Sequence, residues 1–549
     1  MKYSAILLLL AVLTAFAWTG CSKDETIPEE DEVMSDPETM EISLTISETD
    51  AEETDAAAAG ETAEQRVNKA QTNDYAPAYT VIRRDGFTDY SIGTFVAAYN
   101  LMEYGADSTG QTDCTRIIQK LLDKLGDLGG GTLYIPEGFY RINGHLTIHR
   151  GVTIRGDWKK PEPGGSLEGT VLMAYTGRGK GPNAESFIDM EIGAGIMDAV
   201  IWYPEQNPDD ITEYSPTIKM GVDDYFGNEY NNVKNVTFVN CYRAVHFSYT
   251  NGGASPVVNG CYGTPLYIGV EVDNIADVGR VENVHFSPAY WIGCGLYEKL
   301  GIEDPFARPK TQDNLRNYLY ENAVGIIMRR NDWSYAAYIS VEGYSKGFAA
   351  MPSIGSPGST PNGHNYAFHF TGCKIGISIE ASNSVGIMFT NVRVQDCETG
   401  IWIAPGTTDA AQFTDCTLDA QKALFIDPTS DTKVLMTACV IESGEVMAEG
   451  GTLNITDSDF HNTEAAEHIR IGTNGRANIV GNRFDGEAKI TDLSFFRSNI
   501  DHTPLNIEKL PAFTRVQPEE RLPAKLDLFL VTDFGAKEGL SQPDNTDAF

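Results

Sequence analysis

A four-residue pattern recurs along this chain at a nearly constant spacing, and it limits the folds that the chain can adopt. The pattern is a turn-forming or small residue, then valine, cysteine or a small residue, any residue, and a large hydrophobe. Copies begin at Asn391, Asp415, Ala438, Asp457 and Gly481, in steps of 24, 23, 19 and 24 residues. Asn235 and Asn283 begin two further copies 48 residues apart, which is two steps. A period of about 22 residues with alternating strands inside it predicts an all-β fold, the right-handed parallel β-helix.

A β-helix also explains how residues 76–525 can form one domain, although this length is large for a single hydrophobic core. Each coil of a solenoid packs only on its two neighbours, so the domain can grow by adding coils. Leucine-rich repeats have similar periods, but their leucine and asparagine pattern is absent from this sequence.

The cysteines fit the same repeat. Several lie at or near the repeated position, namely Cys241, Cys373, Cys397, Cys416 and Cys439. There they would stack inside the coil as small hydrophobes. Disulfides are the alternative, since a secreted protein meets an oxidising compartment. No CxxC pair indicates a zinc site, so the sequence predicts no metal.

The stretch from Tyr104 to Trp158 predicts how the coil begins. A turn at Gly105–Asp107 is followed by an amphipathic helix, for which Thr112 or Asp113 is the expected N-cap. Apolar residues recur on one face of this helix, at Ile117, Ile118, Leu121, Leu122 and Leu125. Short strands separated by glycines come next. We therefore expect a short N-terminal helix that caps the open end of the β-helix.

This stretch resembles the N-terminal signature of the pectate-lyase superfamily, in its rhamnogalacturonase/epimerase-like branch. The matching parts are Tyr104-Gly105-Ala106, Thr112-Asp113, the glycines at 129–131, and the strand at 133–140 with its Pro-x-Gly-x-Tyr ending. The resemblance implies a pectin-lyase-like β-helix. It does not fix the activity, because that fold hosts lyases, hydrolases, epimerases and phage tailspikes.

The opening motif occurs a second time near the end of the sequence. Asp533-Phe534-Gly535-Ala536 is followed by a polar loop and then by Asn545-Thr546-Asp547. Residues 526–549 therefore predict the start of a second β-helix domain, the rest of which would be a missing partner in the same chain. Two such domains resemble the two-barrelled exo-β-1,3-glucanases, whose active site lies between the barrels. Chance similarity of a few residues is the alternative.

The N-terminus predicts export. Residues 1–20 contain Lys2 and an apolar run too short to span a bilayer, which is typical of a signal peptide. Thr19-Gly20-Cys21 resembles a bacterial lipobox with Cys21 as the lipidated residue, and the acidic residues after it resemble the surface-export signal of Bacteroidetes lipoproteins. We expect an outer-membrane lipoprotein exposed on the cell surface, anchored to the membrane by lipid. An ordinary secretory signal with an incidental cysteine is the alternative.

The density of acidic residues distinguishes the N-terminal segment from the body, and the net charge limits which ligands the protein is expected to bind. The chain has 77 acidic and 41 basic residues, a net charge of −36. Residues 21–75 are acidic and poor in aromatics, which predicts a disordered tether between lipid and domain. The sequence has no stripe of basic residues, so nucleic acid is not an expected partner. The acidic body disfavours a polyanionic substrate, although a local basic cleft would reverse that argument.

The repeat breaks at 287–366, and this aromatic-rich segment is the predicted insertion and binding face. Rings stack on sugar faces, and arginine and carboxylate groups hydrogen-bond sugar hydroxyls. The expected substrate-binding residues are Tyr290, Trp291, Arg329, Arg330, Trp333 and Tyr335. The alternative is that these aromatics cover a small core of the insertion itself.

The predicted activity is that of a glycoside hydrolase acting on a polysaccharide. Such enzymes usually need one protonated and one ionised carboxylate, and Asp332 and Glu342 are the expected catalytic pair. No cofactor is then required. A polysaccharide lyase is one alternative, with a base among Arg329, Arg330, Tyr335, His285 and His364, and with Ca²⁺ or arginine neutralising the substrate carboxylate. A non-catalytic glycan-binding or structural β-helix is the other. The catalytic motifs of polygalacturonases and pectate lyases are absent, so their residues cannot be carried over.

Overall fold

The computed structural model describes residues 77, 79–83, 94–222, 228–247, 252–501 and 503. The signal peptide predicted at 1–20, the lipidation site Cys21, the tether at 21–75 and the second-domain segment at 526–549 lie outside these ranges. None of the helices in the described ranges has the length and apolar character of a membrane span.

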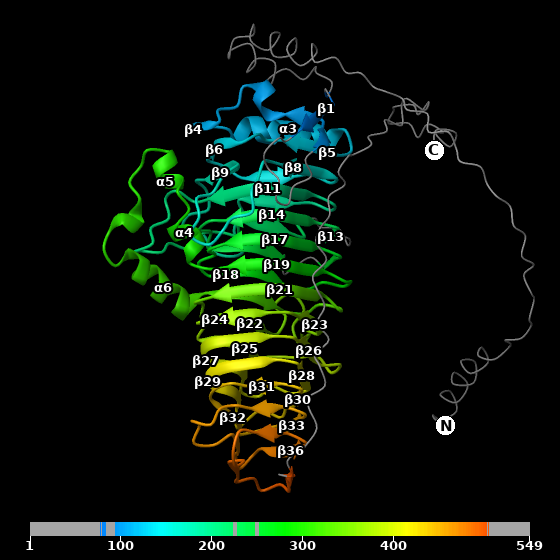
Figure 1. Cartoon of the computed structure of the whole chain (residues 1–549). Helices are drawn as coiled ribbons and strands as arrows, with labels where there is room; N and C mark the ends of the chain where they lie inside the picture. Colours follow the sequence, from blue (N-terminus) through cyan, green and yellow to red (C-terminus); the bar gives the residue numbers. More distant parts are fainter. Residues whose placement is uncertain are drawn as a thin grey trace, which may run out of the picture. The chain divides into compact units, whose positions relative to one another are not determined.

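The described chain winds into a parallel β-helix of three sheets, as the repeat predicts (Figure 1). Every strand pair within the coil is parallel, and each strand pairs with strands one turn away. A turn of the coil contributes one short strand to each sheet. Long strands bend at a corner and belong to two sheets.

Sheet one holds β7 (Leu146–Ile148), β10 (Ile188–Met190), β12 (Ile218–Met220), β15 (Arg243–Phe247), β18 (Ile268–Val272), β20 (Val324–Met328), β22 (Lys346–Ala350), β25 (Ile375–Ile379), the ends of β27 (Arg393–Ile403) and β29 (Thr417–Ile426), β32 (Glu445–Ala448), β35 (Ile469–Ile471) and β38 (Ile490–Asp492).

Sheet two holds β3 (Tyr99–Asn100), β5 (Gly131–Tyr134), β8 (Val152–Arg155), the first halves of β11 (Gly195–Trp202), β14 (Asn232–Phe238), β17 (Val257–Gly263), β19 (Arg280–Phe286) and β21 (Tyr335–Glu342), then β23 (Gly363–Tyr366), β26 (Ile387–Thr390), β28 (Ala410–Thr414), β30 (Lys433–Thr437), β33 (Thr452–Thr456), β36 (Arg476–Val480) and β39 (Asn499–Ile500).

Sheet three holds β4 (Thr109–Asp113), β6 (Gly138–Ile142), β9 (Thr170–Ala174), the second halves of β11, β14, β17, β19 and β21, β24 (His369–Thr371), the starts of β27 and β29, β31 (Val440–Ile441), β34 (Asp459–Phe460) and β37 (Arg483–Phe484). Two small pairs lie apart from the coil, β1 (Thr80–Arg83) with β2 (Thr94–Ala97), and β13 (Asn228–Glu229) with β16 (Gly253–Ala254).

The predicted pattern marks the corner between sheets two and three. Its first residue has a positive φ of 48–70° at all seven predicted positions. Asparagine, aspartate and glycine tolerate this left-handed conformation, which turns the chain within one residue. Gly260, at φ 69°, occupies the same corner midway between Asn235 and Asn283, so the 48-residue gap holds two coils. Three further corner residues, with positive φ, were not found by the sequence pattern: Asp198, Tyr338 and Ala367.

The coil interior is apolar and contains cysteine, as predicted. All eight cysteines of the described residues are buried and free, and none of them forms a disulfide. Space inside is tight where sheet one faces sheet three. A Cβ on Gly347 would lie 2.3 Å from Cδ1 of Phe370, so only glycine fits there.

The helix α3 (Thr115–Asp127) covers the N-terminal end of the coil, as expected. Four of the five predicted apolar residues are buried and Ile117 is partly buried. The N-cap is Cys114 and not Thr112 or Asp113, because the helix begins at Thr115; Asp113 Oδ1 still accepts a hydrogen bond from the Thr115 amide at 3.0 Å. The preceding turn, which leads from the 3-10 helix η1 (Leu101–Tyr104), is closed by Asp107. Burial raises the pKa of that carboxylate, but hydrogen bonds from Thr109 and Thr112 outweigh this effect and hold the pKa at about 2.

The segment 287–366, expected as one insertion, has two parts in the structure. Between β19 and β20 lie α4 (Ala289–Ile292), α5 (Leu296–Lys299), η2 (Pro305–Ala307) and α6 (Thr311–Asn322), which project beside the coil (Figure 1). Residues from Val324 onward return to the three sheets as β20 to β23. The sequence hides this return because the next corner residue is Tyr338, which is neither small nor turn-forming.

Candidate carbohydrate-binding groove

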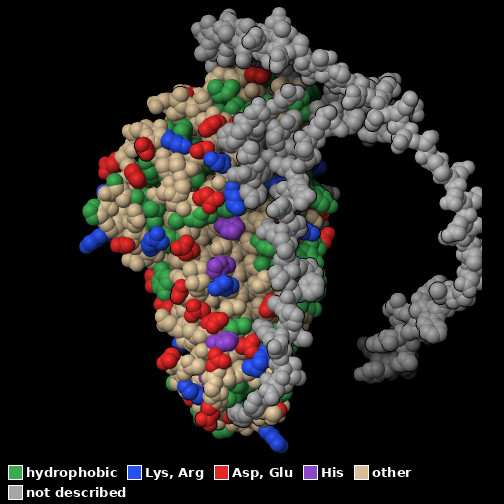
Figure 2. Space-filling model, in the orientation of Figure 1, with side chains coloured by type: hydrophobic (Ala, Val, Ile, Leu, Met, Phe, Trp, Pro, Cys, Tyr) green, Lys and Arg blue, Asp and Glu red, His purple; other side chains and the backbone are tan. Residues whose placement is uncertain are grey.

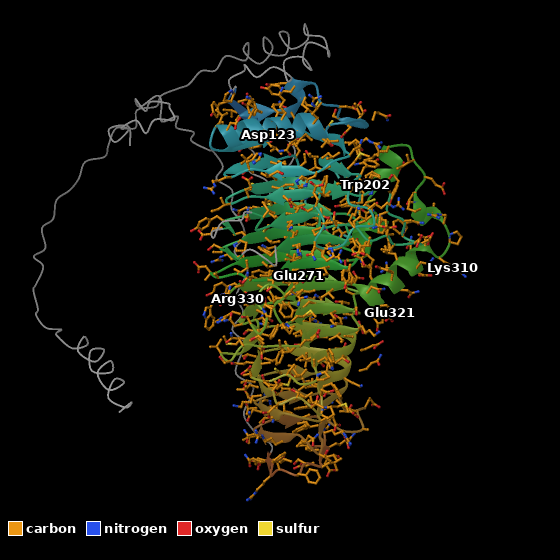
Figure 3. The ribbon with its side chains drawn as sticks, turned by 180° about the vertical axis from the view of Figure 1, so that it is seen from behind. Asp123, Trp202, Glu271, Lys310, Glu321 and Arg330 are labelled. Carbon is orange, nitrogen blue, oxygen red and sulfur yellow. The ribbon has the colours of Figure 1, made fainter. Side chains whose placement is uncertain are left out.

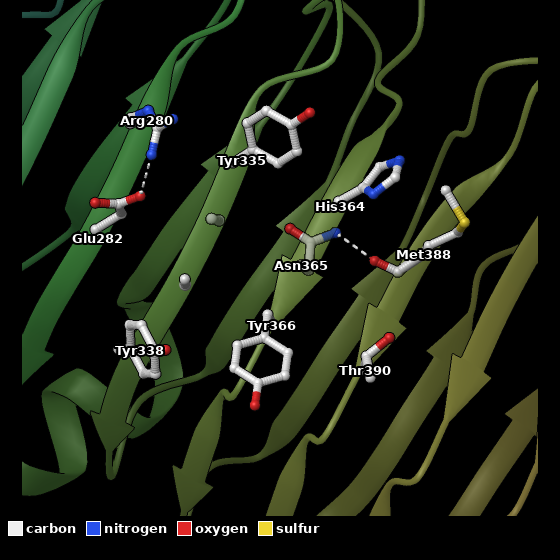
Figure 4. A pocket seen from close by; sticks show the side chains of 11 residues that line it. Arg280, Glu282, Tyr335, Tyr338, His364, Asn365, Tyr366, Met388 and Thr390 are labelled. Carbon is white, nitrogen blue, oxygen red and sulfur yellow. Dashed lines mark hydrogen bonds and ion pairs between the residues drawn. The ribbon is translucent and has the colours of Figure 1, made fainter. Parts of the chain in front are cut away.

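A groove of about 700 Å³ lies on the outer face of sheet two, across four successive coils (Figure 4). Its walls come from β19, β21, β23 and β26. The lining residues are Arg280, Glu282, Tyr335, Ala336, Ala337, Tyr338, His364, Asn365, Tyr366, Met388 and Thr390. The groove therefore runs along the coil axis, perpendicular to the strands.

Strand register builds the groove in rows. Arg280, Tyr335, His364 and Met388 are register partners on successive strands, and so are Glu282, Ala337, Tyr366 and Thr390. Side chains alternate between the two faces of a strand. Both rows point outward, because the residues between them in each strand are buried. Neighbouring members of a row are about 4.8 Å apart.

Tyr335 and His364 line the groove on its two middle strands, and Trp333 lies beside them. Trp333 and Tyr335 are 43% and 40% exposed. Each ring meets the His364 ring edge-on, with centroids 5.7 Å apart. Trp333 has a φ of 60°, which is unfavourable for a bulky residue, and its amide donates to Asn362 Oδ1 at 2.8 Å. An exposed tryptophan held in a strained conformation is a feature that clusters at functional sites.

Two tyrosines form the side of the groove nearest the corner. Tyr338 and Tyr366 pack edge-on with ring centroids 5.7 Å apart. The Tyr366 hydroxyl is buried and has no hydrogen-bond partner among the described residues. A buried hydroxyl without a partner gains free energy when a ligand supplies one.

The groove contains one ion pair. Arg280 Nη1 donates to Glu282 Oε1 at 3.1 Å, and the Arg280 guanidinium lies 5.9 Å from the centre of the Tyr335 ring. Glu282 is the single carboxylate among the residues that line the groove. The groove therefore offers aromatic, imidazole, hydroxyl and guanidinium groups, but not a pair of carboxylates.

The structure does not bring the predicted catalytic pair together. Asp332 precedes β21, where Arg330 Nη2 donates to it at 2.7 Å. Glu342 ends β21 on sheet three, beyond the corner at Tyr338, and accepts from Ser287 Oγ at 2.7 Å. An eight-residue strand separates them, which corresponds to roughly 20 Å at the usual rise per residue. Two carboxylates so placed cannot flank one glycosidic bond.

Two of the predicted binding residues are buried in a hydrophobic core that the insertion shares with the coil. Tyr290 is 4% exposed and Trp291 is fully buried. Trp291 Nε1 donates to the Tyr297 hydroxyl at 2.9 Å, and the Tyr290 ring packs against Tyr262. Neither side chain can stack on a ligand in this arrangement.

Arg329 lies in a buried ionic network rather than on the surface. Its Nε donates to Glu271 Oε1 at 2.7 Å, and its Nη1 donates to the carbonyl of Pro352 at 2.7 Å. His246 Nδ1 lies 3.1 Å from the other oxygen of Glu271. Burial raises the pKa of Glu271, but His246 and Arg329 outweigh it and hold the pKa at about 2. In the register of sheet one, Glu271 pairs with His246 and Ile327, on the side opposite the interior residues Val270 and Ile326, and Figure 3 labels it over the middle of the coil with Arg330 near its edge.

Of the predicted site residues, the structure thus places Tyr335 in the groove and Trp333 beside it. His364, which the sequence offered only as a candidate base, joins them. Sequence reasoning missed several lining residues, namely Arg280, Glu282, Tyr338, Tyr366 and Met388. Only the register between coils brings them together, and a single sequence gives that register only after each corner residue is known.

The other histidine named from sequence lies elsewhere. His285 sits on the outer side of sheet three, stacked on Tyr262 with ring centroids 5.0 Å apart. Burial and the nearby Lys160 lower its pKa to about 4. Figure 2 shows histidine side chains in a row along one face of the coil. In the described ranges no three His, Cys, Asp or Glu side chains are grouped as ligands of one ion, so these residues do not indicate where Ca²⁺ would bind.

Comparisons with known proteins match the cap and the coil. Residues 98–166 match the family described as rhamnogalacturonase A/epimerase, pectate lyase-like. The chain is 46% identical over 46 residues to alginate lyase 7 of Azotobacter vinelandii, and 40% identical over 65 residues to mannuronan C5-epimerase AlgE1 of the same organism. These alignments cover 8% and 11% of this chain, but each spans only 5% of the relative's length.

Two solved structures are similar over most of the coil. One is the catalytic unit of a GH87 α-1,3-glucanase from Streptomyces thermodiastaticus, with 13% identity, a TM-score of 0.43, and coverage of 76% of this chain and 70% of that chain. The other is the A-module of mannuronan C-5 epimerase AlgE4 from Azotobacter vinelandii, with 13% identity, a TM-score of 0.40, and coverage of 74% and 98%. The chain is a right-handed parallel β-helix with a pectate-lyase-like N-terminal segment.

Proposed function

We propose that this protein binds a polysaccharide chain in the groove on sheet two and acts on it there. The observation that carries the proposal is the exposed cluster of Trp333, Tyr335 and His364 along one side of a groove that crosses four coils. Aromatic faces and a long, shallow groove suit an extended chain of sugar rings. The relatives include an alginate lyase and mannuronan epimerases, which supports a carbohydrate ligand.

The reaction that the groove residues fit is proton abstraction beside a substrate carboxylate, as in a polysaccharide lyase. Tyr335 and His364 can supply the base, and Arg280 can neutralise the carboxylate when it exchanges its bond to Glu282 for the substrate. Hydrolysis, the activity expected from sequence, needs a second carboxylate in addition to Glu282. That group would have to come from outside the groove, for example from the second domain predicted at 526–549.

The test uses the full-length protein with alginate, pectate and β-1,3-glucan. We would follow new reducing ends together with the ultraviolet absorbance of an unsaturated product. Both signals together indicate a lyase, and reducing ends alone indicate a hydrolase. If the protein is retained on an immobilised polysaccharide and neither signal appears, it binds the polysaccharide without cleaving it.

Variants locate the activity. Tyr335→Ala and His364→Ala are expected to lower retention on the polysaccharide about tenfold or more. The matched control is Thr417→Ala on the outer side of sheet three, where an exchange leaves the groove intact. Unchanged retention in both groove variants would contradict the proposal.

A further inference from the structure

The groove continues into a strip of uncharged side chains on the same face, all of them polar except Leu435 and Val480. Beyond Met388, its row continues in register through Gln412, Leu435, Asn454, Asn478 and Asn499. Beyond Thr390, the neighbouring row continues through Thr414, Thr437, Thr456 and Val480. We call these nine residues the amide–hydroxyl strip. It extends from the groove to the last coil of the described chain.

The strip is accessible and evenly spaced. Its members are exposed or half-buried, and the residues that alternate with them face the core. Successive members are about 4.8 Å apart along the coil axis. Gln412 Nε2 and Thr414 Oγ1 are 3.4 Å apart, as are Thr437 Oγ1 and Thr456 Oγ1, which are weak bonds. At the last coil Asn499 Nδ2 donates a stronger bond to Asn478 Oδ1 at 2.7 Å. The weakly bonded amide and hydroxyl groups can therefore exchange these contacts for a ligand's hydroxyls.

Threonine and asparagine also occur on outer strand faces that bind nothing, because threonine favours strands. Sheet three shows what these same coils carry where no such strip exists. Its outer row reads Arg393, Thr417, Val440, Asp459 and Arg483. Charged groups interrupt that row, and Arg483 forms an ion pair with Asp459. On sheet two these two adjacent rows carry no charge, whereas the third outward row of the same strands reads Ala410, Lys433, Thr452 and Arg476.

We propose that the amide–hydroxyl strip is an extended binding track that holds the continuation of the polysaccharide chain beyond the groove. This inference rests on the proposed function, because it takes the groove as the anchor of the same chain. The strip offers donors and acceptors for sugar hydroxyls, and Lys433 and Arg476, exposed in the third outward row of the same strands, offer cations for carboxylates beside it. Its ligand is thus the continuation of the carboxylate-bearing chain that is anchored in the groove, bound by many weak hydrogen bonds.

The experiment measures affinity against chain length. The full-length protein is titrated with a disaccharide, a tetrasaccharide and an octasaccharide of β-1,3-glucan, of cellulose and of alginate. Wild type is expected to bind the alginate octasaccharide about tenfold more tightly than the alginate tetrasaccharide. Thr437→Glu and Asn454→Glu, each made alone, should remove this gain and leave tetrasaccharide affinity unchanged. Thr417→Glu, the same change on sheet three, is the matched control.

Each outcome decides between the two proposals. Equal affinity for tetrasaccharide and octasaccharide would overturn the track and leave the groove in place. A length-dependent gain that survives both strip variants would also overturn it. A gain confined to the neutral series would assign the ligand to an uncharged chain, against the inference. Binding of no oligosaccharide in any series would overturn the groove and, with it, the track. Thermal unfolding checks that each variant is folded.

Discussion

Two clusters of side chains lie on either side of the turn between β20 and β21. They differ in burial and in how fully their polar groups are hydrogen-bonded. Arg329, at the start of the turn, is buried and bonded to Glu271 and to the carbonyl of Pro352. Trp333 and Tyr335, a few residues later, are exposed and touch His364 only through ring edges. From the sequence alone, all three residues are equally suitable for binding a sugar.

The buried Arg329 network positions the exposed cluster of Trp333, Tyr335 and His364. The Arg329 network ties the turn to the loop at 351–362, where Asp273 also accepts bonds from Ser353 and from the amide of Ile354. That loop supplies Asn362, which holds the Trp333 amide, and it leads directly into the strand that bears His364. A buried, fully bonded network fixes position. The loosely bonded aromatics are left for a ligand.

The largest expected effect comes from breaking the buried cluster. Arg329→Met leaves Glu271 buried without its guanidinium partner, and loss of one partner of a buried ion pair costs about 3–5 kcal/mol. Chemical denaturation of the variant should show this fall in the free energy of unfolding. Arg330→Met is the matched control, because its pair with half-exposed Asp332 contributes at most about 1 kcal/mol. Similar losses in the two variants would show that the Arg329 network is not the stabilising one.

A smaller effect should appear as acid sensitivity. The folded-state pKa of Glu271 is about 2, against an ordinary value of 4.5, because His246 and Arg329 favour its ionised form over the opposing effect of burial. A lowered pKa adds stability that is complete above about pH 4.5 and is lost as the pH falls toward 2. Unfolding free energies measured across this window should fall less steeply in Glu271→Gln than in wild type. Equal slopes would remove Glu271 from the acid response.

The sequence alone predicts the coil well, because one position in each turn carries a strict backbone demand. Asn391 and Asp415 are visible as corner residues since few side chains tolerate a positive φ. Tyr338 and Ala367 meet the same demand without the usual chemistry, supported by neighbouring coils, and a single sequence does not reveal them. The missing corners made the return to the coil after Asn322 look like more insertion.

The site is harder to predict because it depends on register between coils. Asp332 and Glu342 are close in sequence, yet a strand and a corner separate them. Arg280 and His364 are 84 positions apart by number, yet they flank Tyr335 as register partners. Composition identified an aromatic-rich segment, but only burial decides which aromatics support the insertion and which face the groove.

A substitution at Trp333 is expected to change stability least and yet to weaken polysaccharide binding clearly. Its φ of 60° suits asparagine better than tryptophan, so Trp333→Asn should relieve backbone strain and raise the free energy of unfolding by about 1 kcal/mol. The backbone amide can still donate to Asn362, so the turn is retained. Retention on the polysaccharide should nevertheless fall about tenfold, since the exposed ring is lost. Tyr230→Asn is the matched control, because Tyr230 is 60% exposed at φ 61° but lies outside the groove. If Trp333→Asn gains stability and keeps full binding, the ring is not part of the site, and the exposed cluster reduces to Tyr335 and His364.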